Sequence, residues 1–172
     1  CGVQLIEFEV ATIVFEPATV DEAKLNDTLQ SFEFETVIVD DRGKVVLSQT
    51  RQAFYFVELL EGVPSLELVA IPSGEFMMGS PVDEPERYDD ESPQHQVSLP
   101  PFFISKYPIT QAQWRSVAKL PQQERELILD PANFKGDERP VEQVSWYEAV
   151  EFCRRLSEQT GRNYRLPTEA EW

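Results

Sequence analysis

The sequence predicts an α+β protein with many loops. Three observations support this class: β-forming residues dominate positions 1–60, two capped helices come later, and turns containing Gly and Pro separate the elements. With 172 residues, 41% of them hydrophobic, the chain is long enough to bury one core. We therefore expect one principal domain with an appendage.

The first segment is typical of a strand followed by a polar break. Val3–Phe15 is rich in Val, Ile, Phe and Thr, which favours a β-strand. Residues 16–31 are polar and contain one Pro, and Asp21–Leu29 forms either a short helix or a linker.

A β-hairpin is predicted next. Phe32–Val39 alternates, with Phe32, Phe34, Thr36 and Ile38 on one face, and Asp40–Lys44 supplies a turn. Two further strands are expected at Val45–Leu47 and Gln52–Leu60. This sheet either precedes the main domain or forms its edge. We assign 1–62 to a β-rich N-terminal extension and 63–172 to the main domain.

The main domain begins with short strands. We expect a strand at Leu66–Ile71, a short apolar segment at Glu75–Ser80, and another strand region in which Gln94–Leu99 continues into 100–108. Gly74 and Gly79 are expected to permit turns between them.

Two helices carry clear start signals. The first begins at the capping box Thr110–Gln113 and continues to about Leu120, and the second begins at the capping box Ser145–Glu148 and ends at Gly161. Helical spacing places one apolar face on the second helix, made of Trp146, Ala149, Val150, Cys153, Leu156 and Ser157.

The end of the sequence carries a third capping box, Thr168–Glu171, followed by Trp172 alone. Because a helix needs several turns to offset its nucleation cost, we expect the chain to be the front part of a longer protein. We also expect that it is no autonomous stable domain. The start at Cys1 is compatible with a processed lipoprotein, although a cut in a longer chain explains it as well.

The charge limits the partners. The chain has 31 acidic and 15 basic residues and a formal net charge of −16. Nucleic acids and anionic membranes both require a basic face, so neither is expected as a partner. Nor is any apolar run near the roughly 20 residues that span a bilayer. We expect a cytoplasmic protein.

The sequence offers no catalytic, cofactor-binding or metal-binding set. The cysteines are Cys1 and Cys153 and the histidine is His95, too few for a zinc cluster, and no nucleophile motif accompanies them. We interpret Cys153 as a packing residue and His95 as a hydrogen-bonded loop residue. The acidic run at 83–91 lacks the spacing of a calcium loop and is interpreted as a solvated loop.

Five motifs then occur in a fixed order. They are Ile71-Pro72-x-Gly74-x-Phe76-x-Met78-Gly79-Ser80, Pro93-x-His95-x-Val97, Tyr107-Pro108-Ile109-Thr110 with Gln113-Trp114, Arg139-Pro140-Val141-x-x-Val144-Ser145-Trp146-x-x-Ala149-x-x-Phe152-Cys153, and Tyr164-Arg165-Leu166-Pro167-Thr168-Glu169-Ala170-Glu171-Trp172. Over Leu66–Trp172 the chain resembles the sulfatase-modifying-factor family, which contains the formylglycine-generating enzymes. The N-terminal extension is similar to that of bacterial, particularly cyanobacterial, multidomain members.

The resemblance implies an elaborated C-type-lectin-like fold, α+β and loop-rich, truncated here. It also implies that the copper-binding cysteines and the calcium sites of the family follow the position of Trp172, so the expected cofactors of this fragment are none. We expect the motif residues to be architectural. Trp114, Trp146 and Phe152 would fill the core, Arg165 would pair with Glu169, and Asn133 would cap a turn.

Several functions follow from the resemblance. We favour a ligand- or protein-binding or regulatory module, inactive as an enzyme in this fragment. The alternative is a copper-dependent oxidase that converts a sulfatase cysteine to formylglycine with residues that follow Trp172, and an iron-dependent sulfoxide synthase is a third member type. The expected partner is a protein or small ligand that binds to the part of the protein following Trp172, or a complementary chain.

Overall fold

The computed structural model describes residues 12–15, 29–60 and 62–172 of the chain. The elements in chain order are β1 (Val14–Phe15), β2 (Gln30–Val39), β3 (Val45–Leu60), β4 (Val63–Ile71), β5 (Gly74–Met78), the 3₁₀ turn η2 (Asp89–Glu91), β6 (His95–Leu99), β7 (Phe102–Ser105), α2 (Gln111–Ala118), α3 (Trp146–Thr160) and β8 (Tyr164–Arg165). The fold is α+β and loop-rich, as predicted.

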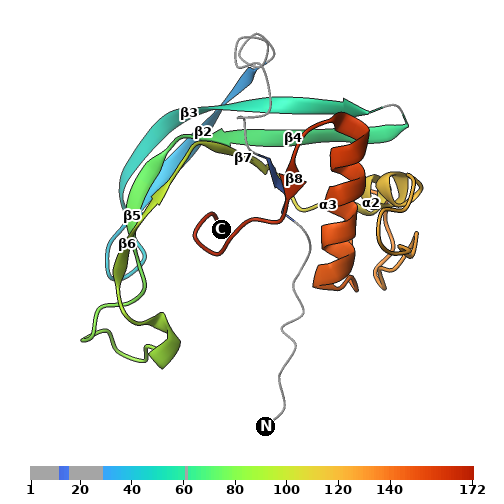
Figure 1. Cartoon of the computed structure of the whole chain (residues 1–172). Helices are drawn as coiled ribbons and strands as arrows, with labels where there is room; N and C mark the ends of the chain where they lie inside the picture. The colour runs from blue at the N-terminus through green and yellow to red at the C-terminus, as the bar shows by residue number, and fades with distance from the viewer. Residues whose placement is uncertain (1–11, 16–28, 61) are drawn as a thin grey trace.

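One antiparallel sheet organises the molecule. Its strand order is β2-β3-β4-β7-β1-β8, and β5 pairs with β6 in a separate two-stranded sheet. Helices α2 and α3 pack together under one end of the large sheet, while the two hairpins curve away from the other end (Figure 1). Of the strand expected at Val3–Phe15, the structure describes only β1. The helix or linker expected at Asp21–Leu29 lies outside the described residues except for Leu29.

The β2–β3 hairpin forms as predicted, with one correction. Gln30 pairs with Tyr55 and Val39 with Val45, so β3 is one continuous strand, whereas two strands were expected. Polar residues in the middle of the hairpin form hydrogen bonds between the two strands. For example, Thr36 Oγ1 donates to the carbonyl of Gln49. At the turn, Oδ1 of Asp40 accepts hydrogen bonds from the backbone amides of Arg42 and Lys44.

The hairpin is continuous with the main sheet. β3 pairs with β4 from Tyr55–Val69 to Leu60–Val63, across the boundary that was placed between 62 and 63. The β-rich segment is thus an edge of the large sheet. The division into two domains stays a prediction.

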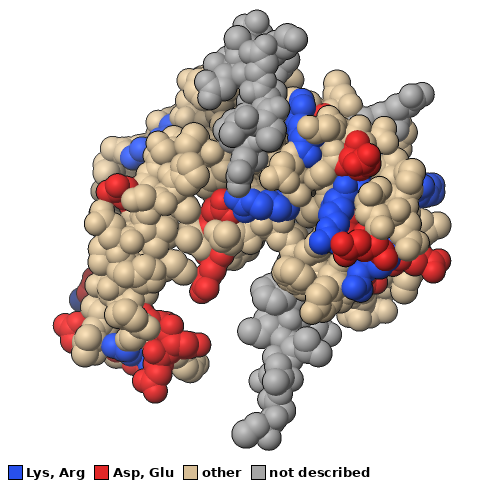
Figure 2. All heavy atoms as spheres, in the orientation of Figure 1, with Lys and Arg blue, Asp and Glu red and all other residues tan. Residues whose placement is uncertain are grey.

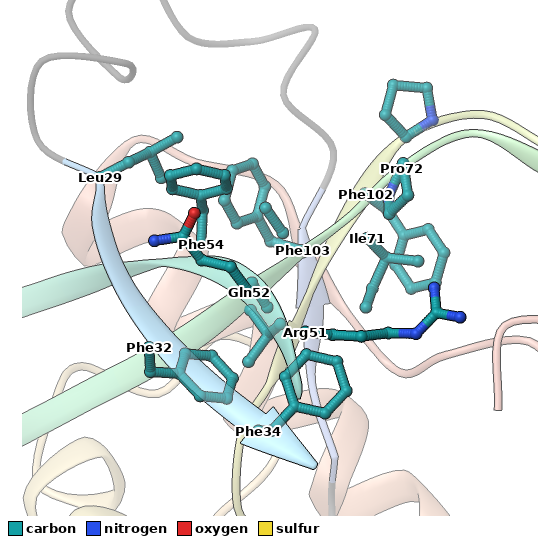
Figure 3. A pocket seen from close by; sticks show the side chains of 14 residues that line it. Leu29, Phe32, Phe34, Arg51, Gln52, Phe54, Ile71, Pro72, Phe102 and Phe103 are labelled. Atoms are coloured by element: carbon teal, nitrogen blue, oxygen red, sulfur yellow. The ribbon is translucent and has the colours of Figure 1, made fainter. Parts of the chain in front are cut away.

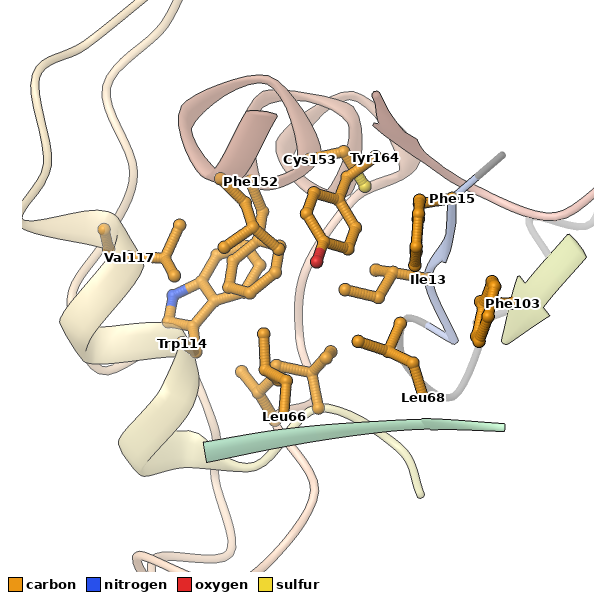
Figure 4. Packing of buried hydrophobic residues seen from close by; sticks show 14 of the residues in the cluster. Ile13, Phe15, Leu66, Leu68, Phe103, Trp114, Val117, Phe152, Cys153 and Tyr164 are labelled. Atoms are coloured by element: carbon orange, nitrogen blue, oxygen red, sulfur yellow. The ribbon is translucent and has the colours of Figure 1, made fainter. Parts of the chain in front are cut away.

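The core lies between the large sheet and the helices. Trp114 and Phe152 are fully buried and stack with ring centroids 5.3 Å apart, and Phe15 stacks on Phe103 at 4.8 Å (Figure 4). The expectation for Trp114 and Phe152 is confirmed.

The expectation for Trp146 is wrong. This side chain is 56% exposed, because it occupies the first position of α3 at the border of the core. There it meets Tyr147 edge-on at 5.1 Å, and Tyr147 is itself exposed.

The predicted helix caps are confirmed. Thr110 and Ser145 both accept a hydrogen bond from the amide three residues later, and both capping boxes are complete. Gly161 ends α3 with φ of 71°, a left-handed conformation that favours glycine. The first helix ends at Ala118, two residues before the predicted end.

The two glycines of the first motif differ. Gly79 has φ of 93°, and a Cβ atom there would lie 2.5 Å from the carbonyl oxygen of Glu91, so only glycine fits this turn. Gly74 starts β5 with open space around it and needs no glycine, contrary to our expectation.

A buried ion pair on α3 forms hydrogen bonds with the loop that follows α2. The side chains of Glu151 and Arg155 are 1% and 3% exposed, and Arg155 Nε donates to Glu151 Oε1 at 2.7 Å. Arg155 also donates to the carbonyls of Ala118, Leu120 and Arg125 at 2.6–3.1 Å. Glu151 accepts from the amides of Gln123 and Glu124, both at 2.9 Å.

Those bonds fix the protonation of Glu151. Burial raises its pKa, but the hydrogen bonds from Gln123, Arg155 and Glu124 outweigh burial and hold the pKa below its usual range. The carboxylate therefore stays ionised inside the fold.

Candidate binding groove at the split in the sheet

The large sheet splits at one point. Pairing between β3 and β4 stops at Tyr55–Val69, whereas β2 and β3 stay paired as far as Val39–Val45. On the other side, β4 stays paired with β7 as far as Ile71–Phe102. Two β-ribbons therefore diverge beyond Tyr55, one made of β2 and β3 and the other of β4 and β7, continued by β5 and β6.

A groove of about 1070 Å³ lies at this split. Its lining residues come from both ribbons and are mostly apolar. They are Leu29, Phe32, Phe34, Arg51, Gln52, Ala53, Phe54, Val69, Ala70, Ile71, Pro72, Pro101, Phe102 and Phe103. We call this the split groove. In Figure 3, Leu29, Phe54 and Phe103 gather on one side of it and Phe32, Phe34 and Arg51 on the other.

Several aromatic rings of the split groove are open to solvent. Phe34 is 39% and Phe54 48% exposed, while Phe102 and Phe103, which also line the groove, are buried. Exposed aromatic side chains around a hollow are typical of sites that bind another molecule.

Arg51 supplies the charge of the split groove, since the other lining side chains are uncharged. Its Nε donates to Thr36 Oγ1 at 3.3 Å, and its terminal nitrogen donates to Gln49 Oε1 at 3.1 Å. Both acceptors are neutral. No carboxylate among the described residues lies within ion-pair distance of this guanidinium.

A lysine fixes the base of the split. Lys106 Nζ lies 2.7 Å from Glu67 Oε2 and sits over the rings of Phe32 and Tyr55, 4.6 and 4.9 Å from their centroids. The hydrogen bond from Lys106 to Glu67 raises the pKa of the lysine. This contact links β2, β3, β4 and the end of β7 where the ribbons separate.

A second polar cluster ties β3 to β8 inside the core. Tyr164 Oη donates to Glu58 Oε2 at 2.6 Å, and Arg162 Nε lies 3.0 Å from the same oxygen. Burial, with the nearby Glu58 carboxylate, raises the pKa of Tyr164. The phenol therefore remains a hydrogen-bond donor at any physiological pH.

Comparison with known proteins identifies the family of this chain. The model of the sulfatase-modifying factor enzyme 1-like domain matches residues 60–172. The chain belongs to this family.

Three relatives show the range of the family. The chain is 36% identical to the chaperone protein LppX of Paenibacillus barcinonensis, over 53% of this chain and 26% of that protein. It is 28% identical to the hercynine oxygenase of Mycolicibacterium smegmatis, over 87% of this chain and 44% of that protein. The solved structure of PvdO from Pseudomonas aeruginosa superposes with a TM-score of 0.51 at 33% identity, over 61% of this chain and 44% of that chain.

The chain thus spans less than half the length of these relatives. Together with the family match, the PvdO superposition establishes the formylglycine-generating-enzyme-like, C-type-lectin-like fold predicted from the motifs.

The cysteine that the structure describes, Cys153, is free and buried in this sulfatase-modifying-factor domain. Cys153 is 2% exposed on the inner face of α3, and burial raises the pKa of its thiol to about 12. A copper site needs thiolate, so Cys153 does not fit one. Its interpretation as a packing residue is confirmed. Cys1 lies outside the described residues.

The other singled-out residues lie apart from one another. His95 is exposed at the start of β6, where Nδ1 lies 2.9 Å from the carbonyl of Pro93, so it belongs to a strand and not to a loop. The acidic run at 83–91 forms the far tip of the β5–β6 ribbon (Figure 2). No group of three or more His, Cys, Asp or Glu side chains fit to hold a metal occurs in the described residues.

The third capping box forms without a helix. Thr168 and Glu171 exchange the expected bonds, with the amide of Thr168 donating to Glu171 Oε2 at 2.8 Å. Glu171 also pairs with Arg165 at 2.6 Å, whereas we had expected Glu169 as the partner of Arg165. The hydrogen bond from Arg165 lowers the pKa of Glu171 to about 2. The cap expected of Asn133 stays a prediction.

Sequence reasoning missed the split groove, Arg51 and the buried Glu58. The alternation of Phe32 and Phe34 was noticed, and both side chains line the groove, but nothing in the local sequence indicated where β3 leaves β4.

For the described residues, no helix has the length and apolarity needed to cross a membrane.

Proposed function

We propose that this formylglycine-generating-enzyme-like domain acts as a binding module, with its own contribution made by the split groove. The observation that carries the proposal is the groove itself, a hollow of about 1070 Å³ with exposed Phe34 and Phe54 at its rim. Its volume is at the upper end of small-molecule pockets and suits a peptide or a protein segment. A chaperone among the relatives supports a role in binding proteins.

An unbiased selection tests the proposal. A displayed library of random peptides is panned against the 172-residue chain, and each recovered peptide is measured against Phe34→Asp and Phe54→Asp. Both residues are partly exposed, so the fold should tolerate the changes. We expect these variants to lose at least about tenfold in affinity, since an aspartate would have to be desolvated against apolar surface.

The matched control is Val82→Asp. Val82 is 89% exposed and lies outside the groove, so its change adds the same charge without touching the lining. Recovery of no binder, or binders equally insensitive to all three variants, would refute a binding role for the groove.

An oxidase remains the second candidate, because the similarity to the hercynine oxygenase extends over 87% of this chain. Such an activity, whether copper-dependent formylglycine formation on a sulfatase cysteine or a related oxidation, would use residues other than those described here. The test is copper-dependent oxygen uptake with a cysteine-containing sulfatase peptide, with the product read by mass spectrometry. Conversion of the peptide cysteine to an aldehyde by a protein that contains the whole family domain would favour the oxidase.

The expectation that a ligand binds beyond Trp172 stays a proposal for the whole protein. So do calcium and copper as its cofactors.

A further inference from the structure

The edges of the split groove carry backbone groups free for pairing. On β3, the residues from Val45 to Phe54 are paired with β2 on one side only, because β4 leaves the ladder at Tyr55. On the opposite ribbon, β4 beyond Val69 is paired with β7 on its far side only. Within the described residues, no other backbone hydrogen bond reaches either edge. Unpaired strand edges are templates for another strand.

Both edges border the same groove. Arg51, Gln52, Ala53 and Phe54 line it from β3, and Val69, Ala70 and Ile71 line it from β4. A strand added along β3 would pair with its free edge, and its side chains would meet Val69, Ala70 and Ile71 where the ribbons separate.

Both faces of an inserted strand would meet apolar side chains. Cross-strand pairing places Phe32 with Ala53 and Phe34 with Arg51 on one face of the ribbon, and Phe54 on the other. Figure 3 shows the same separation, with Phe54 and Phe103 opposite Phe32 and Phe34. Successive residues of a strand point to opposite faces, so the groove favours a strand that is apolar on both.

The positive charge of Arg51 favours an inserted strand that carries a carboxylate. The Arg51 guanidinium faces this apolar space with neutral acceptors only. A carboxylate on the inserted strand would form a charge-assisted hydrogen bond with this guanidinium. A second copy of this chain is disfavoured as the source, since each copy carries a net charge of −16.

We propose that the split groove accepts an extended segment of a partner protein as an additional β-strand, apolar on both faces and with one carboxylate placed beside Arg51. This inference rests on the proposed binding function and names its partner class. It needs no metal and no catalytic step.

Two blocked nonapeptides test the pairing. Both consist of Val, Thr and Phe, and one has a central Glu where the other has Lys. We expect the Glu peptide to bind the 172-residue chain at least about tenfold more tightly than the Lys peptide. Arg51→Glu should reverse this preference, and Arg51→Met should abolish it without reversal.

Arg42→Glu is the matched control. It makes the same charge change in the turn of the same hairpin, outside the groove, and should leave the preference unchanged. Hydrogen exchange on the complex should show new protection in 45–54, the edge of β3 that the added strand would pair.

Three results would overturn the inference: binding of neither peptide at millimolar concentration, equal binding of both, or protection confined to other segments. A dimer in sedimentation equilibrium that the Glu peptide does not dissociate would instead identify a second copy as the occupant. If the random library still yields binders that depend on Phe34, the binding function stands and only the strand-and-carboxylate inference fails.

Discussion

Replacing Arg155 with Met should release the loop 119–126 from α3. The change removes four donated hydrogen bonds, one to Glu151 and three to backbone carbonyls. It also leaves the Glu151 carboxylate buried with two amide donors and no cation. Breaking a buried ion pair from one side costs about 3–5 kcal/mol. Part of that cost falls on the three orphaned carbonyls.

Hydrogen exchange gives the local readout. The amides of Gln123 and Glu124 donate directly to Glu151, so they exchange only when this loop opens. Since 1.4 kcal/mol is a factor of ten, we expect their exchange to accelerate by about 10²- to 10³-fold, up to the limit set by global unfolding.

The neighbouring Arg154→Met is the matched control. Arg154 lies on the same helix with a side chain 45% exposed and pairs at the surface with Glu124. Exposed pairs contribute about 0–1 kcal/mol, so this variant should change exchange by less than about fivefold. Arg155→Lys, which keeps the charge and loses the fork of donors, should fall between the two. Equal effects of Arg154→Met and Arg155→Met would refute the reasoning.

Further outcomes follow from burial and charge. Cys153 should resist thiol reagents at pH 8 in the folded chain and react fully in denaturant, because its pKa of about 12 leaves almost no thiolate; rapid native labelling would contradict its burial. Trp114→Ala should destabilise by about 3–5 kcal/mol in urea unfolding, whereas Trp146→Ala should cost under about 1 kcal/mol, because only the first ring is buried. The pKa of Glu171 lies below its ordinary 4.5, so its pair with Arg165 stabilises the C-terminal turn fully above about pH 4.5 and is lost as pH falls through about 2. A carboxyl titration by NMR should therefore move toward 4.5 in Arg165→Gln, and an unchanged midpoint would exclude the pair as the cause.

The local part of the fold was readable from the sequence. Thr110 and Ser145 were recognised as helix starts because a capping box is complete within four residues, and Gly161 as a helix end for the same reason. The motif order was also readable, and it led to the correct family and fold. These signals depend on neighbours in the chain, which the sequence shows directly.

What was missed depends on contacts between distant segments. Glu151 and Arg155 are four residues apart on a helix, a spacing that usually means a surface pair. Their burial comes from a loop that closes over them. Trp146 was expected in the core because it shares a helical face with Cys153, and periodicity cannot show where the neighbouring elements end. The split groove depends on where β3 leaves β4, a register choice made between strands and not within either one.

The position of β1 has a consequence for how the protein is made. Val14 pairs with Ile104 on one side and with Arg165 on the other, so a short early segment lies between two later ones. On a ribosome, this strand has no complete site until residues near 165 have emerged, while the β2–β3 hairpin can form much sooner. The β2–β3 hairpin would then stay exposed until the remaining strands of the sheet have been synthesised. We therefore expect the need for chaperones during synthesis to depend on the delay before β8 emerges and not on the total chain length.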